Sequence, residues 1–467
     1  MRKQFLLTLL VAVATIAASA QDVRFVQKYT LPEFRDISIW KGHPGLTRFS
    51  PDGKYLAVSG KTTDVVIYSL ETGEVKSRID GPGFRAFSFC PDGKTVVAQN
   101  SVDQSVHIFD IETGKVVTDV RGLSKMPTIS RSIGINYVLP EINGLMPRGA
   151  FEMGRVQTTR DWKSILVNHN EKEFSIYAFP TGEPKFDLEH EKYKGGWEKV
   201  KMTLAIMSLA SGNPSGMLLL AMESLAYTQF SDDGRYLIIS NGNKFPTLWD
   251  VETGKLIAKI DAGEHVLFTK FDPTGTKVAT SDAHGVTKIW STATGDLLTT
   301  IGDKDSPGLA AGWSATGDKV FILPVRRGDL QAYSSDGHVA YAFQSSEPDG
   351  MLLSPDSKLI LTVPKKNKQI LFQLWDTENG ELKATVPRTL AQKGLLSVKF
   401  SPDGSLIALS TENKDVVDVW DVTGKHIQRL ENSNLPFEFS ADSHYLATGG
   451  LSHDPKLDTG YVWEIKR

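Results

Sequence analysis

The stretch Phe49-Ser50-Pro51-Asp52-Gly53-Lys54 contains a turn phrase that returns along the whole chain. Pro presets the first corner of a type I turn, Asp bonds the local backbone, and Gly accepts the left-handed conformation that closes a hairpin. Copies of the phrase begin at Phe49, Phe89, Thr158, Phe230, Phe271, Trp313, Leu353, Phe400 and Phe439. Their spacings are 40, 69, 72, 41, 42, 40, 47 and 39 residues. The regular spacings match the period of four-stranded propeller blades.

Each copy opens the same order of predicted strands. An alternating apolar stretch such as Tyr55–Val58 follows the turn and is typical of a β-strand. A second strand ends in an aromatic residue, as in Thr247–Trp249, and a second tight turn such as Glu252–Gly254 leads to a last strand. One blade therefore consists of strand a, a turn, strand b, a loop, strand c, a second turn and strand d. Nine copies predict nine blades, but the copy at Thr158–Lys163 is degenerate, so eight blades remain an alternative.

The two ends of the chain predict a closed ring. The ninth unit stops at its strand c, Tyr461–Ile465, and therefore lacks a strand d. Either Val23–Val26 or Asp36–Trp40 alternates suitably and can supply the missing strand. Such a strand joins the two ends in one blade and removes an open sheet edge. We therefore predict a single all-β propeller of four-stranded blades, closed by an N-terminal strand.

Three predicted strands c end in a Trp-Asp pair, at Trp249-Asp250, Trp375-Asp376 and Trp420-Asp421. In these residues the chain resembles the WD40-type propeller family, and the resemblance covers most of residues 23–467. Gly42-His43 is the only Gly-His pair at the expected place, so the chain is more similar to divergent bacterial members, the YVTN-like and quinoprotein-like propellers. The resemblance implies a rigid interaction platform more often than an enzyme, although a fold does not fix a function.

Residues 1–20 have the pattern of a secretory signal peptide. A basic pair precedes the apolar run Phe5–Ile16, and Ala18-Ser19-Ala20 supplies a cleavage site of small residues. The apolar run is shorter than the roughly 20 residues that a membrane span requires. We therefore predict an exported protein of the periplasm or extracellular space, whose propeller occupies residues 21–467 and has no membrane span after cleavage.

Composition excludes several classes of protein. The chain has 467 residues, of which 40% are hydrophobic, so it can bury a large core. Its 52 Lys and Arg residues against 55 Asp and Glu residues give a net charge of −3, which disfavours a nucleic-acid partner. The single cysteine, Cys90, excludes an internal disulfide framework and a cysteine-rich zinc site. Cys90 takes the Ser position of its turn phrase, where we expect packing rather than nucleophilic attack.

The long connections are predicted to gather on one face of the ring. In a blade, a–b and c–d turns leave one face and b–c and d–a loops leave the other. The turns are all short, whereas residues 121–155 and 187–224 form two long d–a insertions. The second insertion has an apolar stripe that predicts a short helix. Two roles stay open for the insertions: they contact a partner, or they plug the channel or cover a weak blade.

Methionine and basic residues define the candidate interaction surface. Seven of the nine methionines lie between residues 126 and 222, and methionine recurs at adaptable binding surfaces. Two basic b–c loops of adjacent units add a patch that would attract an anionic surface. The candidate residues are Met126, Tyr137, Met146, Met153, Trp197, Met202, Met207, Met217, Met222, Arg326, Arg327, Lys365, Lys366 and Lys368.

The sequence contains no catalytic motif that we can identify, such as a nucleophile elbow, a zinc-protease helix or a phosphate loop. His453, Asp454 and Asp458 share one b–c loop, but their spacing matches no strong metal template. We therefore predict no catalytic residue, cofactor or metal. The predicted function is a non-catalytic scaffold that binds a protein or ligand on the b–c/d–a loop face. Two alternatives remain: a lactonase- or quinoprotein-like enzyme with a central-channel site, and an envelope assembly module.

Overall fold

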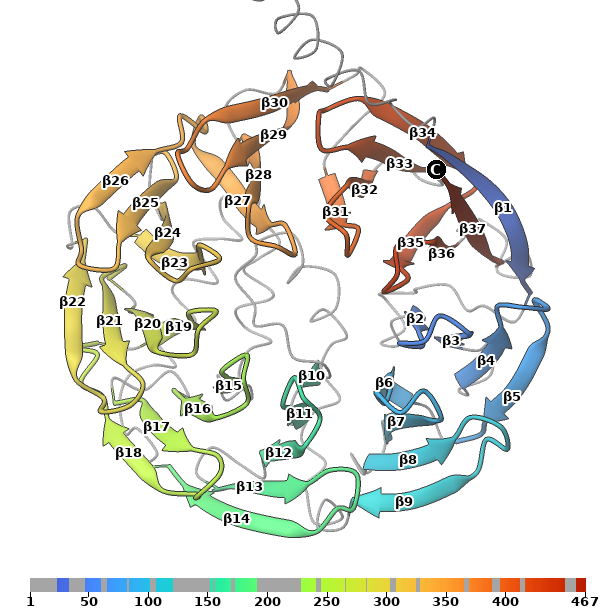
Figure 1. Cartoon of the computed structure of the whole chain (residues 1–467), viewed down its shortest axis with the longest axis horizontal. Helices are drawn as coiled ribbons and strands as arrows, with labels where there is room; N and C mark the ends of the chain where they lie inside the picture. Colours follow the sequence, from blue (N-terminus) through green and yellow to red (C-terminus); the bar gives the residue numbers. More distant parts are fainter. Residues whose placement is uncertain are drawn as a thin grey trace, which may run out of the picture.

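The structure, a computed structural model, arranges its sheets in a ring (Figure 1). The residues that it describes are 23–32, 47–59, 65–81, 84–100, 106–120, 152–153, 156–168, 173–190, 228–240, 245–264, 266–282, 284–302, 308–324, 328–364, 369–388, 395–411, 416–449 and 459–467. These residues form nine sheets, eight of four strands and one of five. The predicted nine-bladed all-β propeller is confirmed, and the eight-bladed alternative is wrong.

Each blade has its strand a nearest the centre and its strand d at the rim (Figure 1). Strands a of blades 1 to 9 are β2 (Thr47–Phe49), β6 (Phe84–Phe89), β11 (Val156–Thr158), β15 (Thr228–Phe230), β19 (Val266–Phe271), β23 (Gly308–Trp313), β27 (Pro348–Leu353), β31 (Leu395–Phe400) and β35 (Asn434–Phe439). Strands b are β3 (Tyr55–Ser59), β7 (Thr95–Asn100), β12 (Ser164–Asn168), β16 (Tyr236–Ile239), β20 (Lys277–Asp282), β24 (Lys319–Pro324), β28 (Leu359–Pro364), β32 (Leu406–Thr411) and β36 (Tyr445–Gly449).

The outer half of each blade consists of strands c and d. Strands c are β4 (Val65–Ser69), β8 (Val106–Asp110), β13 (Glu173–Ala178), β17 (Thr247–Asp250), β21 (Thr287–Ser291), β25 (Gln331–Ser334), β29 (Ile370–Asp376), β33 (Val416–Asp421) and β37 (Gly460–Lys466). Strands d are β5 (Val75–Ile79), β9 (Val116–Val120), β14 (Pro184–Glu189), β18 (Leu256–Lys259), β22 (Leu297–Ile301), β26 (Val339–Ala342), β30 (Leu382–Pro387), β34 (His426–Glu431) and β1 (Arg24–Leu31).

Blade 3, which has the degenerate turn, is a complete blade with one additional strand. A short strand β10 (Glu152–Met153) pairs with β11 at the inner end of this sheet. β10 lies inside the predicted insertion 121–155, and β14 continues to Glu189, inside the predicted insertion 187–224. All regular structure in the described part of the chain is β-strand, and the predicted helix falls on residues outside that part.

The ninth blade takes its outer strand from the N-terminal end of the chain. β1 pairs antiparallel with β37, from Arg24 opposite Lys466 to Leu31 opposite Gly460. The Phe25 side chain is only 4% exposed and packs in a cluster with residues of blades 8 and 9. Of the two candidate segments, Val23–Val26 overlaps the start of β1, whereas Asp36–Trp40 lies outside the described residues.

The hydrophobic core lies between neighbouring blades. In one cluster Leu361 and Leu374 of blade 7 pack with Val398, Ile407 and Trp420 of blade 8. Comparable clusters join the other neighbours, so each sheet buries both of its faces. Burial of apolar surface at about 25 cal/mol per Å² therefore accumulates around the whole ring.

Contacts at the rim repeat from blade to blade as well. A residue of strand d lies against the glycine of the c–d turn in the next blade, and a Cβ at that glycine would press on it. The pairs are Phe186 with Gly254, Ala258 with Gly295, Thr299 with Gly337, Tyr341 with Gly380, Ala384 with Gly424, and Tyr29 with Gly73. Because Tyr29 belongs to β1 and Gly73 to blade 1, β1 occupies the same place as the other strands d.

Buried indole groups bind threonine hydroxyls within several blades. Trp290 Nε1 donates to Thr280 Oγ1 at 2.9 Å, and Trp375 Nε1 donates to Thr362 Oγ1 at 2.8 Å. The same Trp–Thr bond therefore recurs in blades 5 and 7. In blade 8, Leu409 takes the threonine position, and Trp420 Nε1 is buried without a hydrogen-bond partner.

Candidate interaction surface

Most of the predicted interaction surface lies outside the described part of the chain. Met153 is described in its backbone, which pairs with Val156. The residues outside the described ranges are Met126, Tyr137, Met146, Trp197, Met202, Met207, Met217, Met222, Arg326, Arg327, Lys365, Lys366 and Lys368. His453, Asp454 and Asp458 of the weak metal candidate are also outside them. That surface remains a prediction, and the site built below is the one that the described residues form.

The nine a–b turns make a structure that we call the turn ring. Its members are Ser50–Tyr55, Cys90–Thr95, Thr159–Ser164, Ser231–Tyr236, Asp272–Lys277, Ser314–Lys319, Ser354–Leu359, Ser401–Leu406 and Ser440–Tyr445. In the first turn, Ser50 Oγ donates to Asp52 at 2.7 Å and accepts the Tyr55 N–H at 2.8 Å. The hydroxyl thus fixes both the carboxylate and the closing end of the hairpin.

The hydroxyl-to-carboxylate bond recurs around the turn ring. The same bond links Thr159 to Asp161, Ser231 to Asp233, Ser354 to Asp356, Ser401 to Asp403, and Ser440 to Asp442. In blade 6, Ser314 donates to Asp318 instead. From the sequence, the Asp of the turn phrase was predicted to bond the local backbone and was not predicted to belong to a site. The sequence signal that could have identified this bond is the repeated Ser or Thr two positions before the Asp.

Neighbouring turns touch one another through these carboxylates. A Cβ at Gly53 of blade 1 would lie 3.2 Å from Asp442 Oδ2 of blade 9. A Cβ at Gly93 would lie 3.3 Å from Asp52 Oδ2, one blade back. The turns of at least blades 9, 1 and 2 are therefore in contact, and their carboxylates point along the ring toward the next glycine.

Hydrogen bonding favours the ionised form of several carboxylates in the turn ring. Burial alone would raise the pKa of Asp52, Asp161, Asp356 and Asp442, but hydrogen bonds from the neighbouring hydroxyls and backbone lower each pKa below its ordinary value. Several of these carboxylates also lie near a cation of the same turn, as in the 3.2 Å pair of Lys163 with Asp161. The turn ring therefore presents fixed negative charge with basic side chains beside it.

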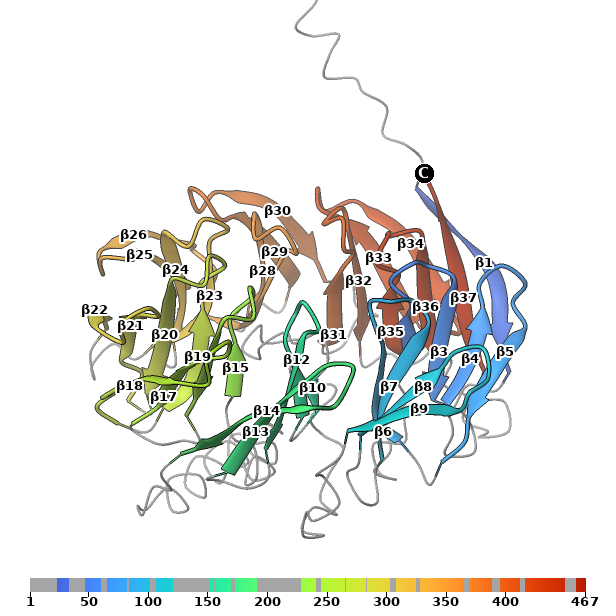
Figure 2. The same cartoon turned by 60° about the horizontal axis from the view of Figure 1, so that its bottom comes forward.

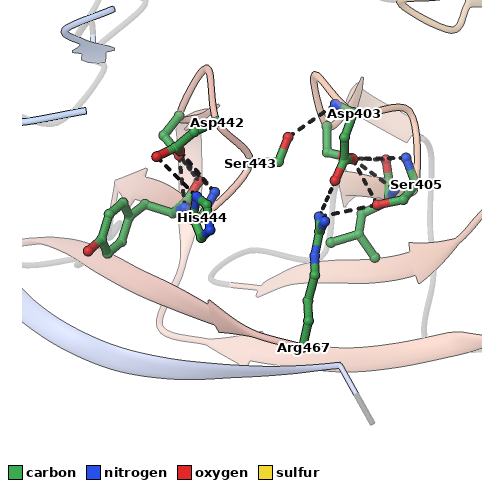
Figure 3. A network of polar contacts seen from close by, with 10 residues as sticks. Asp403, Ser405, Asp442, Ser443, His444 and Arg467 are labelled. Carbon is green, nitrogen blue, oxygen red and sulfur yellow. Dashed lines mark hydrogen bonds and ion pairs between the residues drawn. The ribbon is translucent and has the colours of Figure 1, made fainter. Parts of the chain in front are cut away.

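A network of polar contacts connects the a–b turns of blades 8 and 9 with the C-terminal residue (Figure 3). The Arg467 guanidinium reaches the Asp403 carboxylate and donates to Ser405 Oγ at 3.3 Å. The backbone N–H of Asp403 donates to Ser443 Oγ at 3.1 Å, which joins the turns of blades 8 and 9. Beside them, His444 Nδ1 lies 3.1 Å from Asp442 Oδ2. These bonds fix the relative positions of two neighbouring turns.

A second polar network lies directly below the same turns, on the inner strands. Lys399 Nζ of β31 lies 2.6 Å from Glu438 Oε2 of β35, and Arg48 Nη1 of β2 lies 3.6 Å from the same oxygen. The Glu438 carboxylate therefore lies near a cation of each neighbouring blade. These ion pairs connect blades 8, 9 and 1 at their inner strands.

The thiol of Cys90 is buried in the core between two blades. Cys90 is buried among Val97, Ile165 and Val167, and this burial raises the pKa of its thiol to about 12. The thiolate that nucleophilic attack needs is therefore not populated near neutral pH. Within the described ranges, no group of three or more His, Cys, Asp or Glu residues is placed to hold a metal ion. Nor does that part contain a helix able to span a membrane.

Comparison with known proteins shows a fold and no closer kinship. No family model matches the sequence, and no curated protein matches it. A crystal structure of a eukaryotic initiation factor is 16% identical over 86% of this chain and 90% of that chain, with a TM-score of 0.56. At this identity the likeness shows the fold alone.

Two further solved structures are similar at lower scores. The β-propeller domain of Cps50 (Swd1) from Myceliophteria thermophila is 14% identical over 67% of this chain and 96% of that chain, with a TM-score of 0.41. The computationally designed Ika8 protein is 13% identical over 94% of this chain and 99% of that chain, with a TM-score of 0.47.

Proposed function

We propose that the protein is a non-catalytic scaffold that binds protein partners. The observation that carries this proposal is the turn ring, whose hairpins are braced by their own hydroxyl groups and touch their neighbours. Such bracing holds one face of the ring rigid and gives the opposite face a fixed frame for its loops. Binding residues are disproportionately found on loops that a rigid scaffold positions.

The face proposed for binding carries the b–c and d–a connections. In an antiparallel blade these connections leave the end of the sheet opposite the a–b and c–d turns. The connection from Glu189 to Thr228 is a long d–a connection, whereas the one from Val120 to Glu152 leads into the additional strand β10 of blade 3. By sequence, the methionines of the second insertion and the two basic b–c loops fall in such connections, which supports the choice of this face.

Site-specific photo-crosslinking in an envelope fraction tests this proposal. A photoreactive side chain is placed at Trp197 or Arg326 on the proposed face, and at exposed Pro402 on the turn ring as a matched control. We expect partner adducts from the first two positions and none from Pro402. Adducts from Pro402 alone would move the site to the turn ring, and recovery of the protein alone from every position would contradict a scaffold. Adducts with components of an envelope complex would identify the scaffold as an assembly module.

A deletion separates binding from folding. Removing residues 195–222 takes out most of the second insertion. We expect a chain that still unfolds cooperatively but no longer yields the partner adduct. A chain that fails to fold would instead assign this insertion to the core of the ring.

We also propose that the protein is exported and that its relatives are the divergent bacterial WD40-type propellers. The basic start, the apolar run and the small residues at 18–20 support export. β1 begins at Arg24, so cleavage after residue 20 would leave this strand intact. N-terminal sequencing of the exported protein is expected to read from Gln21, and an intact Met1 would contradict the proposal.

The pairing of β1 with β37 supports a further part of this proposal, that β1 closes the ring. Tyr29 contacts Gly73 of blade 1, and the Phe25 backbone is bonded to Gln428 of blade 8. A propeller with no free edge between its first and last blades resists opening. Deletion of residues 21–31 is expected to lower the melting temperature by more than 10 °C, and an unchanged value would contradict closure by β1.

One observation favours a second candidate, an enzyme with a central-channel site. The ion network of Arg48, Lys399 and Glu438 places three charged groups on inner strands. Turnover of a lactone, or a bound cofactor that absorbs visible light, would support this candidate. A Glu438→Gln variant that removes such activity without lowering the melting temperature would assign it to the channel wall.

A further inference from the structure

Two neighbouring outer strands differ in charge from the rest. β22 (Leu297–Ile301) and β26 (Val339–Ala342) contain no charged residue, whereas each of the other seven strands d contains at least one. Figure 1 and Figure 2 both show β22 and β26 as neighbours on the rim of the ring. Open sheet edges are ordinarily protected by charged side chains, above all lysine. This protection is missing over the rim of blades 5 and 6.

The unprotected edge exposes apolar side chains. Leu297, Leu298 and Val339 are 49%, 50% and 55% exposed, respectively. β22 is also the last strand of its sheet, so its outward backbone groups pair with no strand in the described part of the chain. An edge of this kind offers main-chain hydrogen bonds together with apolar contact, which are the two components of strand addition.

The two edges are held together and bordered by negative charge. Thr299 Oγ1 of β22 donates to the backbone oxygen of Asp336 in the c–d turn of blade 6 at 3.1 Å. This bond fixes β22 against the neighbouring blade before any partner arrives. Asp296, directly before β22, and Asp336 are both exposed. Hydrogen bonds from Ser334 and from the backbone lower the pKa of Asp336, so this carboxylate is charged at neutral pH.

We propose that β22 accepts an extended segment of a partner protein as an additional strand. The segment has an uncharged core of alternating apolar residues, which lies along Leu298 and Val339, and a basic residue that lies beside Asp296 and Asp336. The neutral edge selects the uncharged core, because a charged side chain there would lose hydration without gaining a partner. The bordering carboxylates select the basic residue. This surface lies on the rim and is separate from the loop face.

The shape of the rim favours such a segment over a second copy of the chain. A strand of five residues spans roughly 17 Å, and two convex rims that meet along that length bury little surface. Stable interfaces between folded proteins bury on the order of 1,200 Å² or more. A second copy would also bring another Asp296 and Asp336 into the same contact. An extended segment can follow β22, continue across Val339 and bring the opposite charge.

Peptide binding to the full chain tests this proposal. The probe is the fluorescent, amidated peptide Lys-Val-Thr-Val-Thr-Val-Thr, and fluorescence anisotropy measures its affinity. We expect saturable binding that is at least tenfold weaker for Leu298→Lys and for Val339→Lys. Leu382→Lys in β30 is the matched control, because Leu382 is 48% exposed and its strand already carries Lys383. This control is expected to bind as the unaltered protein does.

Changes in the peptide separate the two parts of the recognition. Proline at the second and fourth positions removes two backbone donors and is expected to abolish binding. Glutamate in place of the lysine is expected to weaken binding severalfold, and less so at high salt. Hydrogen exchange should slow in β22 and stay unchanged in β30 when the probe is present.

Three results would overturn the proposal. The first is the absence of saturable binding to the unaltered protein. The second is an affinity that Leu298→Lys and Val339→Lys leave unchanged, or that Leu382→Lys reduces equally. The third is a concentration-dependent dimer that Leu298→Lys disrupts and the peptide does not displace, since this would assign the edge to a second copy. None of these results bears on the crosslinking test of the loop face.

Discussion

The side-chain amide of Gln428 binds the backbone of Phe25 at both of its polar groups. Gln428 Oε1 accepts the Phe25 N–H at 2.7 Å, and Gln428 Nε2 donates to the Phe25 carbonyl at 3.0 Å. The two residues are 403 positions apart in the sequence. Gln428 lies on the outer strand of blade 8, so one glutamine attaches the N-terminal strand to the blade beside the one that it completes.

Removal of this amide is expected to destabilise the ring at β1. Gln428→Ala loses both hydrogen bonds and should lower the free energy of unfolding by about 1–2 kcal/mol. Chemical denaturation measures the change. Gln27→Ala, an exposed glutamine in β1 itself, is the control and should cost less than about 0.5 kcal/mol. Equal effects of the two changes would mean that the Phe25 contact contributes nothing specific.

Contact between Tyr29 and Gly73 gives a second expectation. Gly73 has a φ of +78°, and a Cβ there would collide with the Tyr29 ring, whose hydroxyl is fixed by a 2.7 Å bond to the Glu71 carbonyl. Gly73→Ala should therefore cost roughly 2–4 kcal/mol, from backbone strain and overpacking together. Gly404 has a φ of +72° with nothing within 4 Å of the added Cβ, so Gly404→Ala should cost only about 1 kcal/mol.

A double-mutant cycle isolates the collision from the strain. In a Tyr29→Ala background, the cost of Gly73→Ala should fall to that of Gly404→Ala, because the ring is gone and the strain remains. An unchanged cost would show that the ring of Tyr29 does not lie on Gly73, and the place of β1 beside blade 1 would then be in error.

The buried Trp–Thr bond predicts the effect of a nearly isosteric change. Thr362→Val removes the acceptor of Trp375 Nε1 in the core of blade 7 and leaves the indole N–H without a partner. The cost should be about 1–2 kcal/mol in the free energy of unfolding. Thr385→Val, at an exposed position of the same sheet, serves as the control and should be close to neutral. Equal stability of the Thr362 variant and the unaltered protein would argue against this hydrogen bond.

Acid is expected to lower the free energy of unfolding by protonating Asp403. Burial alone would raise the pKa of Asp403, but hydrogen bonds from Ser401, Ser405 and Arg467 outweigh it and lower the pKa to about 2. The unfolded chain binds a proton at about pH 3.9, so the stabilising contribution is fully present above that pH. This contribution is lost as the pH falls from about 4 to about 2.

The variant Asp403→Asn removes this titration. Its free energy of unfolding should fall less steeply between pH 5 and pH 2 than that of the unaltered protein, as measured by urea denaturation at each pH. Ser401→Ala removes one of the donors and should give an intermediate slope. Identical slopes for all three proteins would exclude Asp403 as a source of acid sensitivity.

Local sequence patterns predicted the blades because each blade is built from contacts near in the chain. The turn phrase from Ser50 to Lys54 marks an a–b hairpin wherever it occurs, and the aromatic residues such as Trp375 mark strand c. Even the degenerate copy around Asp161 forms its turn, since Thr159 supplies the hydroxyl that Ser supplies elsewhere. The bond from Ser to Asp was not predicted, because an Asp in such a turn can equally bond the local backbone alone.

The turn phrases and their period thus determined the number and order of the strands, because a hairpin depends on a few adjacent residues. Only the tertiary structure decided which N-terminal residues pair with β37, that Glu438 connects the blades on both sides of it, and that the uncharged strands β22 and β26 are neighbours on the rim. Those relationships join residues of different blades. Their partners are set by the packing of one blade against the next, which no local spacing encodes.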